Sequence, residues 1–583
     1  MNKNVFIVFF IALLLRLILI PNPGFEADIS FWKSWGLATL DRGIVGGIAV
    51  SNFNYPTPFA YTLGFLAWLY SLFADPHNFN EYWTNTNTLF LFVAKLPSIM
   101  ADFGIAAIIL WIGKHHAQGR ALNSQLLAAL YLLNPISLID GAWWGQVDSL
   151  GVFIFLLAFV AALTKRPTLA GIVFMVAMMT KLQNMIYGPL FFLFIWQLTG
   201  PTGLIRAAAG SLIAFFGLNI EFLLAHNMSR VVASLVENYD YFPWMSLNAF
   251  NLWWIVAAGR GMEVSDKLLA IGIANAKTVG LFLFSSFYLF ALLRQFLEKK
   301  SILASFLISL IVVNASFFLF QTESHDRYAF PLSVFLLLLA PFYIKKIKVF
   351  FIFYGLYTLL YFYNLHTALV FNYPNNGLPI LSLLTQTPVT IFVSMILLVL
   401  FGGFIVYIAR QTRPLVWIIP IALFLSAITI KNIPLILKKP VDLTSLSPYI
   451  YTQGYGQLTR NMPVNAYQGW REWHFLSVQY AFYRKGFGTH ATSRIDFDIG
   501  KKFKRFMTDV GIDTEAGSAG SAVFEIYGDN RLLYSSGTIG RFELPRHADV
   551  DVSGIKFLTL ITTDAGDGIT DDHTDWLNPK LYP

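Results

Sequence analysis

The stretch that decides the fold is residues 302–340, which read ILASFLISLIVVNASFFLF, then QTESHDRYAF, then PLSVFLLLLA. The first and third segments are almost entirely apolar, and about 20 apolar residues in a row let an α-helix cross the hydrocarbon core of a bilayer. The polar segment between them would then lie near a membrane surface. The sequence thus predicts two membrane spans joined by a short polar loop.

Similar apolar runs recur from the N-terminus to about residue 437. Of the 583 residues, 56% are hydrophobic and only 13% are charged, and the mean hydropathy is +0.58. One soluble core cannot hide that much apolar surface, so the excess is expected to face lipid. We count about eleven to thirteen spans by the criterion of ~20 apolar residues. The first, residues 5–20, is expected to be retained, because Pro21 and Pro23 follow it where a signal peptide would carry small residues.

The charged residues indicate how these spans are oriented. The net charge is +8, but the basic residues cluster in short loops, which are expected on the cytoplasmic side. No basic face exists to carry nucleic acid, so nucleic-acid binding is excluded. The absence of cysteine excludes thiol catalysis, zinc–thiolate sites, iron–sulfur clusters and disulfides. The orienting basic residues are Lys165, Arg166, Arg206, Arg294, Lys299, Lys300, Lys345, Lys346, Lys348, Arg410 and Arg413.

This orientation places loops 143–149, 226–254 and 321–331 outside, and a last span near residues 416–430 leads the C-terminal region outside as well. The same orientation is not self-consistent near the N-terminus. The runs 56–74 and 88–113 would make two crossings, although only an odd number connects the first outer loop to the basic residues between Lys114 and Arg120. One of these two runs is therefore expected to be re-entrant or interfacial.

The character of the sequence changes after about Lys439, where long apolar runs give way to short alternating segments. Residues 522–527 and 532–534 flank Gly528, Asp529 and Asn530, which predicts a β-hairpin. Residues 549–561 are expected to form one buried strand. We therefore predict a multi-pass membrane domain over residues 1–439 and an extracytoplasmic β-sandwich over residues 440–583.

Two carboxylates, Glu26 and Asp28, follow the first span at the membrane boundary. Partial desolvation raises the basicity of a carboxylate, which suits a general base, so both are candidate catalytic residues. The alternative is an interfacial helix in which Asp28 serves only as a cap. The sequence of this loop alone does not decide between a catalytic base and a helix cap.

A second polar group contains Trp144, Gln146 and Asp148, followed in the chain by Lys181 and Gln183. Aromatic rings stack on sugars, while amides and carboxylates bind hydroxyl groups, so the first three residues suit sugar recognition. An aromatic belt with a helix cap at Asp148 is the equally plain alternative. Lys181 interrupts an apolar run beside Gln183, which favours a polar cavity or a bound anion.

A third group, His325, Asp326 and Arg327, is followed by Tyr328. The guanidinium of Arg327 presents donors that match phosphate oxygens, and His325 adds another. The alternative is an internal Asp326–Arg327 ion pair, which adjacent residues form poorly. All these groups fall on one side of the membrane, and no glycine-rich nucleotide loop is found, so a lipid phosphate is the expected anion.

Residues 1–435 resemble the GT-C superfamily of polyprenyl-phosphate-sugar glycosyltransferases, and within it the bacterial mannosyltransferases related to GPI-anchor enzymes. The resemblance rests on Asp28, Tyr55-Pro56, Asn134-Pro135 with Trp144-Gly145-Gln146-Val147-Asp148-Ser149, Lys181-Leu182-Gln183, and His325-Asp326-Arg327-Tyr328. Two positions depart from the family pattern, Asp326 where Glu is usual and Thr57 where a second Pro is usual. The resemblance implies Asp28 as base with Glu26 as the second candidate. It further implies a donor phosphate at His325, Arg327 and Lys181, and sugar contacts at Trp144, Gln146, Asp148, Gln183 and Tyr328.

Residues 448–583 resemble NPCBM, a carbohydrate-binding β-sandwich domain. The matching segments are Lys485-Gly486-Phe487-Gly488-Thr489-His490-Ala491, Val523-Phe524-Glu525-Ile526-Tyr527, and the acidic stretch that leads to Trp576. The Asp-rich run 564–575 suits calcium, although an acidic solvated loop fits as well. No cofactor is expected to be obligatory, with Mg²⁺ or Ca²⁺ as the candidates.

The predicted function is inverting transfer of a mannose-like hexose from a polyprenyl-phosphate donor to a glycan, lipid or protein acceptor outside a bacterial inner membrane. Arg327, His325 and Lys181 would hold the phosphate while Asp28 takes the acceptor proton. A transporter or flippase of lipid-linked sugars is the alternative, although the sequence contains no convincing inverted repeat. A sugar receptor is a third class, but one span would suffice to anchor it.

Overall fold

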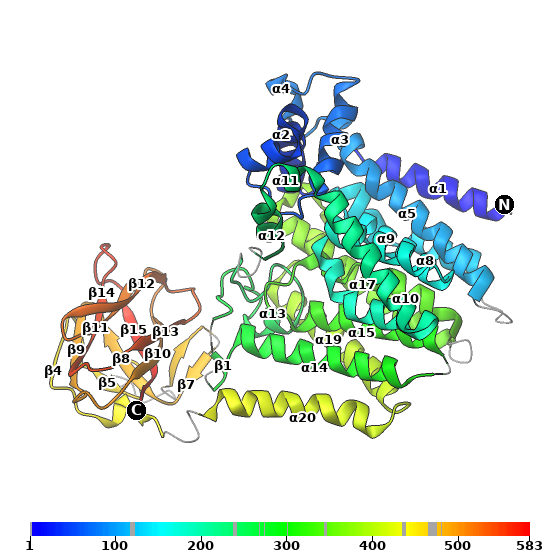
Figure 1. The fold of residues 1–583 in the computed structure, drawn as a ribbon. Helices are drawn as coiled ribbons and strands as arrows, with labels where there is room; N and C mark the ends of the chain where they lie inside the picture. Colours follow the sequence, from blue (N-terminus) through cyan, green and yellow to red (C-terminus); the bar gives the residue numbers. More distant parts are fainter. Residues whose placement is uncertain are drawn as a thin grey trace. The chain divides into compact units, whose positions relative to one another are not determined.

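The computed structural model describes residues 3–116, 123–236, 242–267, 269–272, 274–299, 301–342, 347–433, 439–464, 475–479 and 481–583. The chain forms two compact units (Figure 1). The first contains residues 1–242, 246–259 and 283–423, and the second contains residues 243–245, 260–282 and 424–583. Of the positions singled out in the sequence, Arg120, Lys300, Lys345 and Lys346 lie outside the described residues.

The first unit is helical. Its N-terminal half contains α1 (Lys3–Leu19), α2 (Glu26–Val50), α3 (Phe59–Ser71), α4 (Phe79–Tyr82), α5 (Thr88–His116), α6 (Ser124–Leu132), α7 (Pro135–Ser137), the π-helical turn η1 (Leu138–Trp144), α8 (Asp148–Leu163) and α9 (Pro167–Thr180). Then follow η2 (Leu182–Tyr187), α10 (Gly188–Leu218), α11 (Ile220–Leu224), α12 (Met228–Val236), α13 (Leu252–Val256), α15 (Ile302–Phe320), η3 (Asp326–Ala329), α16 (Leu332–Leu339), α17 (Ile347–Asn372), α18 (Pro379–Ser382) and α19 (Thr387–Ala409). Helices α14 (Ala276–Leu297) and α20 (Pro414–Lys431) each cross from one unit to the other.

Seven helices in the described residues are long and apolar enough to cross a membrane: α5, α10 together with η2, α14, α15, α17, α19 and α20. An eighth is reached if α6 and the segment Pro135–Trp144, which bend by 43° at their junction, form one span. The apolar helices Val5–Leu19, Asp148–Leu163 and Pro167–Thr180 are shorter. The sequence predicted about eleven to thirteen spans. The described residues reach eleven only if the bent pair and these three shorter helices are counted together with the seven long ones.

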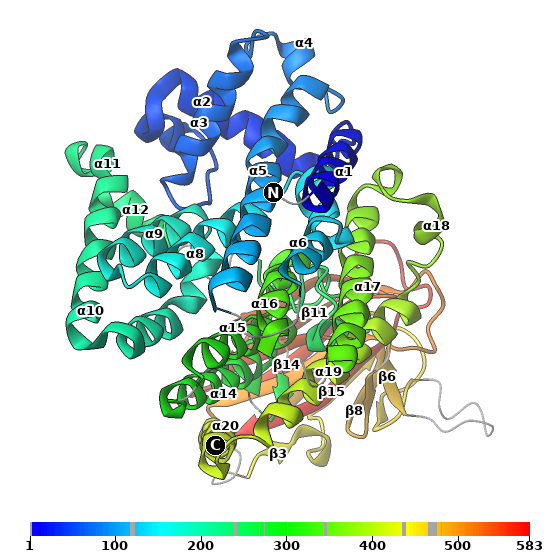
Figure 2. The same ribbon diagram turned by 90° about the vertical axis from the view of Figure 1, so that its right-hand side faces the viewer.

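The structure also bears on the two crossings that conflicted near the N-terminus. Helix α3 has 13 residues, which at about 1.5 Å per residue is roughly 20 Å and too short for a bilayer core. Helix α5 has 29 residues and is a candidate span. The run 88–113 thus contains a helix of spanning length, and the run 56–74 does not. Figure 2 shows α1, α5 and α6 close together, in agreement with their contacts.

Local sequence explains how the backbone reaches the site between η1 and α8. The side chain of Asn134 accepts a hydrogen bond from the Ile136 N–H and so caps α7, and Pro135 occupies the first helical position. Gly145 ends η1 with a φ of 85°, a left-handed conformation that glycine adopts without strain. A Cβ at Gly145 would also lie 2.7 Å from Cδ1 of Ile29, so the Ile29 side chain of α2 packs directly against this glycine.

The second unit contains the β-domain. One sheet has the order β13-β10-β15-β8-β5, with β3 also pairing with β15, and the other has the order β12-β11-β14-β9-β4. Their apolar faces enclose a core that includes Phe487, Phe524 and Trp576. The strands are β3 (Val441–Asp442), β4 (Ile450–Gln453), β5 (Thr459–Arg460), β8 (Gly486–His490), β9 (Ser493–Asp498), β10 (Arg505–Ile512), β11 (Ser521–Gly528), β12 (Arg531–Gly540), β13 (Arg546–Asp551), β14 (Phe557–Thr563) and β15 (His573–Tyr582). The pairs β1 (Leu269–Ile271) with β2 (Ala274–Asn275), and β6 (Leu476–Val478) with β7 (Ala481–Tyr483), are separate small sheets.

Two strand predictions have different outcomes. The hairpin is confirmed: β11 pairs antiparallel with β12, and Asp529 and Asn530 between them both have positive φ, as a type I′ turn requires. The single strand expected over residues 549–561 is wrong. Strand β13 ends at Asp551 and β14 begins at Phe557, with Gly554 at φ 77° in the turn between them. The alternating and the continuously apolar parts belong to two strands in different sheets.

Candidate active site

Asp28 lies in the first turn of α2 and is partly exposed. Its carboxylate accepts a hydrogen bond from the side-chain amide of Gln146, which is itself fully buried. Burial raises the pKa of Asp28, and the nearby positive charges of Arg327 and Lys181 oppose that rise. A carboxylate with a raised pKa that keeps an amide donor has the basicity and the orientation of a general base.

Asp148 begins α8 and pairs with two cations. Its Oδ1 forms an ion pair with Nζ of Lys181, and its Oδ2 lies 4.0 Å from Nε of Arg327. Asp148 and Lys181 are buried. Nε of Arg327 is also buried and makes no hydrogen bond within the part of the chain that the structure describes. Two positive side chains share one carboxylate, so positive charge remains for a further anion.

Backbone pairing fixes the segment that carries Arg327. The Asp326 N–H donates to the Leu247 carbonyl at 3.1 Å, and the Leu247 N–H donates to the Ser324 carbonyl at 2.9 Å. Nη1 of Arg327 lies 3.9 Å from Oδ1 of Asp326. Burial raises the pKa of Asp326 to about 7 and lowers the pKa of His325 well below its usual value. His325 is thus neutral near neutral pH and retains one N–H to donate.

The remaining predicted residues lie around this cluster in different ways. Nε2 of Gln183 donates to the Tyr328 carbonyl at 3.0 Å, so Gln183 supports the Arg327 segment. The ring of Tyr328 lies 5.1 Å from that of His325. Trp144 is fully buried with its ring 5.6 Å from Phe25, so a sugar would reach it only if this packing changed. Both carboxylate oxygens of Glu26 accept amide hydrogen bonds, from Asn85 and Asn376.

Several polar residues near the site were assigned no role from the sequence. Asp140 in η1 is fully buried, and neither of its carboxylate oxygens has a hydrogen-bond partner among the described residues. Tyr55 interacts electrostatically with Asp28 and Arg327. Lys95 on α5 is buried, and its Nζ donates to the carbonyls of Ile20, Asn22 and Trp143 at 2.9, 2.7 and 2.8 Å. A charged residue within the apolar run 88–113 was the signal that would have identified Lys95.

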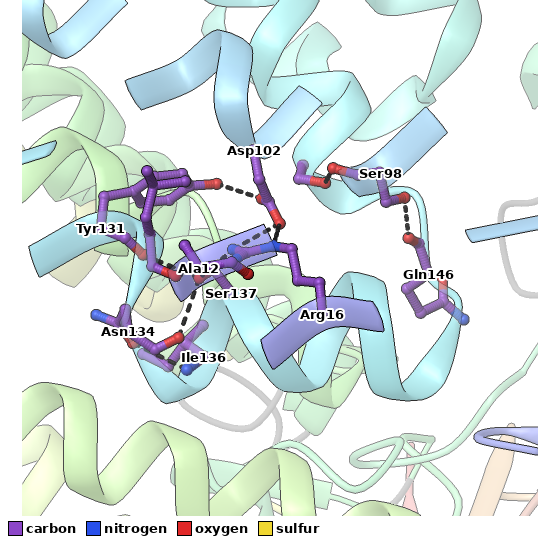
Figure 3. Close-up of polar contacts among 11 residues, drawn as sticks. Ala12, Arg16, Ser98, Asp102, Tyr131, Asn134, Ile136, Ser137 and Gln146 are labelled. Carbon is purple, nitrogen blue, oxygen red and sulfur yellow. Dashed lines mark hydrogen bonds and ion pairs between the residues drawn. The ribbon is translucent and has the colours of Figure 1, made fainter. Parts of the chain in front are cut away.

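A second buried ion pair lies beside this region (Figure 3). Nη2 of Arg16 on α1 lies 2.9 Å from Oδ2 of Asp102 on α5, and both side chains are fully buried. The Tyr131 hydroxyl donates to the other carboxylate oxygen at 2.7 Å. One turn away on α5, the Ser98 hydroxyl donates to the backbone carbonyl of Gln146. The pair therefore holds α1 and α6 against the helix that supports the Gln146 backbone.

No group of three or more His, Asp or Glu side chains that could hold a metal ion occurs within the described ranges. The carboxylates of the cluster face cations: Asp148 faces Lys181 and Arg327, and Asp326 faces Arg327. The arrangement can bind an anion and accept a proton next to it.

Comparisons with known proteins concern mainly the β-domain. Residues 439–582 match the NPCBM/NEW2 domain. Alpha-1,3-galactosidase B of Akkermansia muciniphila is 34% identical over 107 residues, which cover 18% of this chain and 13% of that protein. The chain spans only 7% and 13% of the lengths of the two curated relatives that it matches.

Two solved structures are similar to this chain. CBM51 from Clostridium perfringens GH95, solved with methyl-galactose, is 29% identical and covers 24% of this chain and 99% of its own, with a TM-score of 0.23. The arabinosyltransferase EmbB from Mycobacterium smegmatis is 13% identical and covers 99% of this chain and 64% of its own, with a TM-score of 0.28. The C-terminal part of this chain, residues 439–582, is an NPCBM/NEW2 domain, and it follows a helical region rich in helices that are able to span a membrane.

Proposed function

We propose that the helical region is a membrane glycosyltransferase that moves a sugar from a polyprenyl-phosphate donor to a hydroxyl group of an acceptor. One observation carries the proposal. Asp28, Gln146, Asp148, Lys181 and Arg327 come from four separate segments of the chain, yet they form one polar cluster inside a mostly apolar helical unit. Polar and charged groups at such a depth are costly unless they bind or react with something.

Asp28 is the general base of the proposed reaction. The acceptor oxygen attacks the anomeric carbon and forms the new glycosidic bond, while its proton passes to the Asp28 carboxylate. The bond from the anomeric carbon to the phosphate oxygen breaks, and its electron pair leaves with polyprenyl phosphate. A single displacement of this kind inverts the anomeric centre. The Gln146 amide holds the carboxylate in one orientation, and no covalent sugar–enzyme intermediate is required.

Arg327 and Lys181 would stabilise the phosphate. Negative charge gathers on the leaving phosphate in the transition state, and preoriented cations in a water-poor site stabilise it strongly. Nε of Arg327, which lies 4.0 Å from Oδ2 of Asp148 and makes no hydrogen bond among the described residues, is a candidate donor to a phosphate oxygen. His325, neutral near neutral pH, would add a hydrogen bond without adding charge.

The helix surfaces next to the Arg327 segment are apolar, as a lipid-linked donor would require. Between α15, α16, α17 and α19 they enclose a small cavity of about 40 Å³. Ala329, two residues after Arg327, lines it, and the Tyr357 hydroxyl donates to the Ala329 carbonyl at 2.7 Å. The apolar character of these surfaces suits the isoprene units of a donor whose phosphate lies at Arg327, although the cavity itself holds no such chain unless the helices separate. The remaining lining residues include Ile311, Phe318, Leu336, Phe353, Leu397 and Phe404.

The finer features are proposals of the same kind. We propose a mannose-like hexose as the transferred sugar and an extracytoplasmic site in a bacterial inner membrane, both from the resemblance to GT-C mannosyltransferases. The acceptor is a glycan, lipid or protein at that surface. The NPCBM/NEW2 domain would bind a glycan and keep the enzyme near its acceptor. The two curated relatives that share part of this chain are named for action on glycans.

Purified protein in liposomes with a radiolabelled polyprenyl-phosphate mannose tests the function. The proposal predicts that label moves to a water-soluble or lipid acceptor from the native membrane and that the product has the anomeric configuration opposite to that of the donor. Movement of intact donor between leaflets without transfer would instead identify a flippase. Binding without either would identify a receptor. A parallel series of donors with other sugars determines which one is transferred.

A further inference from the structure

The segment that leads into Asp28 is held by the loop that follows α17. The hydroxyl of Tyr373 accepts a hydrogen bond from the Ala27 N–H at 2.9 Å. Helix α2 has no side-chain cap at Phe25, so this hydroxyl satisfies one of the backbone donors that a helix start leaves without a partner. The ring of Tyr373 also packs on Phe25 at 5.0 Å. The first turn of α2 is thus fixed from outside its own helix.

Asn376 lies at the centre of these contacts and is buried. Its side-chain amide donates to the Gly24 carbonyl at 2.8 Å and to Oε1 of Glu26 at 3.0 Å. Its backbone carbonyl accepts from the Trp143 indole N–H at 2.8 Å and from the Asn22 amide at 3.2 Å. One residue therefore binds the segment before Asp28 and also the segment before Gln146.

Glu26 extends this arrangement in a third direction. Its Oε2 accepts from Nδ2 of Asn85, in the loop before α5, at 2.5 Å, while its Oε1 faces Asn376. Because both oxygens of this carboxylate already accept amide hydrogen bonds, Glu26 is poorly placed to take a proton from an acceptor. Glu26 connects two loops to the start of α2.

The close approach of the backbones shows how little room these segments have. A Cβ at Gly24 would lie 2.4 Å from the Trp144 carbonyl oxygen. Lys95 binds the carbonyls of Asn22 and Trp143 as well, so these segments have a second anchor. Loss of Asn376 would then shift them without unfolding the unit.

We propose that Asn376 is a positioning residue that sets the Asp28–Gln146 geometry, and that Glu26 is its partner and not a second base. The inference rests on the proposed glycosyl transfer. Asn376 touches neither reacting group; it acts on Asp28 through Gly24 and Glu26, and on Gln146 through Trp143. A displacement of about 1 Å at a reacting centre lowers turnover by up to roughly 100-fold.

The test uses full-length protein in liposomes and measures kcat, the KM for the donor and the pH profile. Asn376→Asp keeps the shape but replaces the amide donor with a carboxylate that faces Glu26, and we expect kcat to fall by about tenfold or more with the donor KM nearly unchanged. Glu26→Gln should lower kcat by no more than about threefold and leave the pH profile in place. The matched control is Asn78→Ala, which removes an exposed Asn–Glu hydrogen bond of the same kind, from Asn78 to Glu81.

The decisive variant combines both changes. With Glu26→Gln and Asn376→Asp together, the new amide donates to the new carboxylate, so the hydrogen bond between positions 26 and 376 returns with donor and acceptor exchanged, while the bond to the Gly24 carbonyl stays lost. We expect kcat to recover at least about threefold relative to Asn376→Asp alone. No recovery, or a loss in Glu26→Gln as large as that in Asp28→Asn, would overturn the inference. If the wild-type protein transfers no sugar, the proposed function fails instead, which separates the two.

Discussion

The carboxylate of Asp28 accepts a hydrogen bond from Gln146, although 118 positions separate them in the chain. The contact joins the first turn of α2 to the glycine-terminated π-helical turn before α8. On the far side of Gln146, Asp148 meets Lys181 and Arg327. A proton acceptor and an anion site therefore lie on either side of one short turn, which is the arrangement that a displacement at a sugar phosphate needs.

The pH profile should respond to Asp148. A general base works only when it is unprotonated, so turnover should fall as the pH drops below the pKa of Asp28, which burial raises. The charge of Asp148 also raises this pKa, whereas Lys181 and Arg327 lower it. Replacing Asp148 with Asn removes the repulsion and frees Lys181, so the acidic limb of the kcat profile should move to lower pH. Asp41→Asn, an exposed position on the same helix as Asp28, should leave the limb in place. A limb that moves to higher pH in Asp148→Asn would contradict this coupling.

Arg327 should control the binding of the donor phosphate. Charge-assisted hydrogen bonds contribute about 1.5–3 kcal/mol, so Arg327→Gln should raise the donor Kd by roughly tenfold or more. Arg327→Lys keeps the charge but loses the planar donor pair, so its donor Kd should lie between those of Arg327→Gln and the wild-type protein. Binding of labelled donor to protein in detergent, repeated at high salt, measures the effect. Equal affinity in all three proteins would remove Arg327 from the phosphate site.

The buried pair Arg16–Asp102 should matter for stability and not for chemistry. Removing one partner leaves a buried charge, which costs about 3–5 kcal/mol, whereas replacing both is far milder. Arg16→Met and Asp102→Leu should therefore each lower the thermal unfolding midpoint in detergent more than the double variant does. A double variant as unstable as the sum of the two singles would show that the pair does not interact.

The sequence identified the residues that cluster at the site better than the residues that hold them in place. Polar residues within or at the ends of apolar runs stand out in a sequence, and the structure brings five of them together: Asp28, Gln146, Asp148, Lys181 and Arg327. Asn376 and Asn85 lie in ordinary polar loops, where nothing distinguishes a positioning amide from a solvated one. Arg16, Lys95 and Asp102 lie within apolar runs, and the depth criterion that identified Lys181 applies to them equally. The burial of Trp144 depends on how Phe25 packs, which periodicity does not reveal.

The β-domain should lose stability as the pH rises. Asp575 is fully buried beside Asp513 and Glu515, and its pKa is raised well above the usual value, first by burial and then by Asp513. The unfolded chain releases this proton near pH 4, but the folded domain holds it to higher pH. Stability therefore declines between these two pKa values. Asp575→Asn should unfold at a higher temperature than wild type at pH 8, with the difference shrinking toward pH 4. Circular dichroism of residues 439–583 measures this, and a constant difference across the pH range would contradict the burial effect.

The most direct measurement of the central claim is a single-turnover transfer assay on Asp28→Asn beside Asp41→Asn. With saturating labelled donor and acceptor in liposomes, we expect Asp28→Asn to bind donor normally and to transfer sugar at least about 100-fold more slowly. Asp41→Asn should match wild type. If Asp28→Asn transferred sugar at the wild-type rate, another group would have to take the acceptor proton, and the account of this site as built around Asp28 would be wrong.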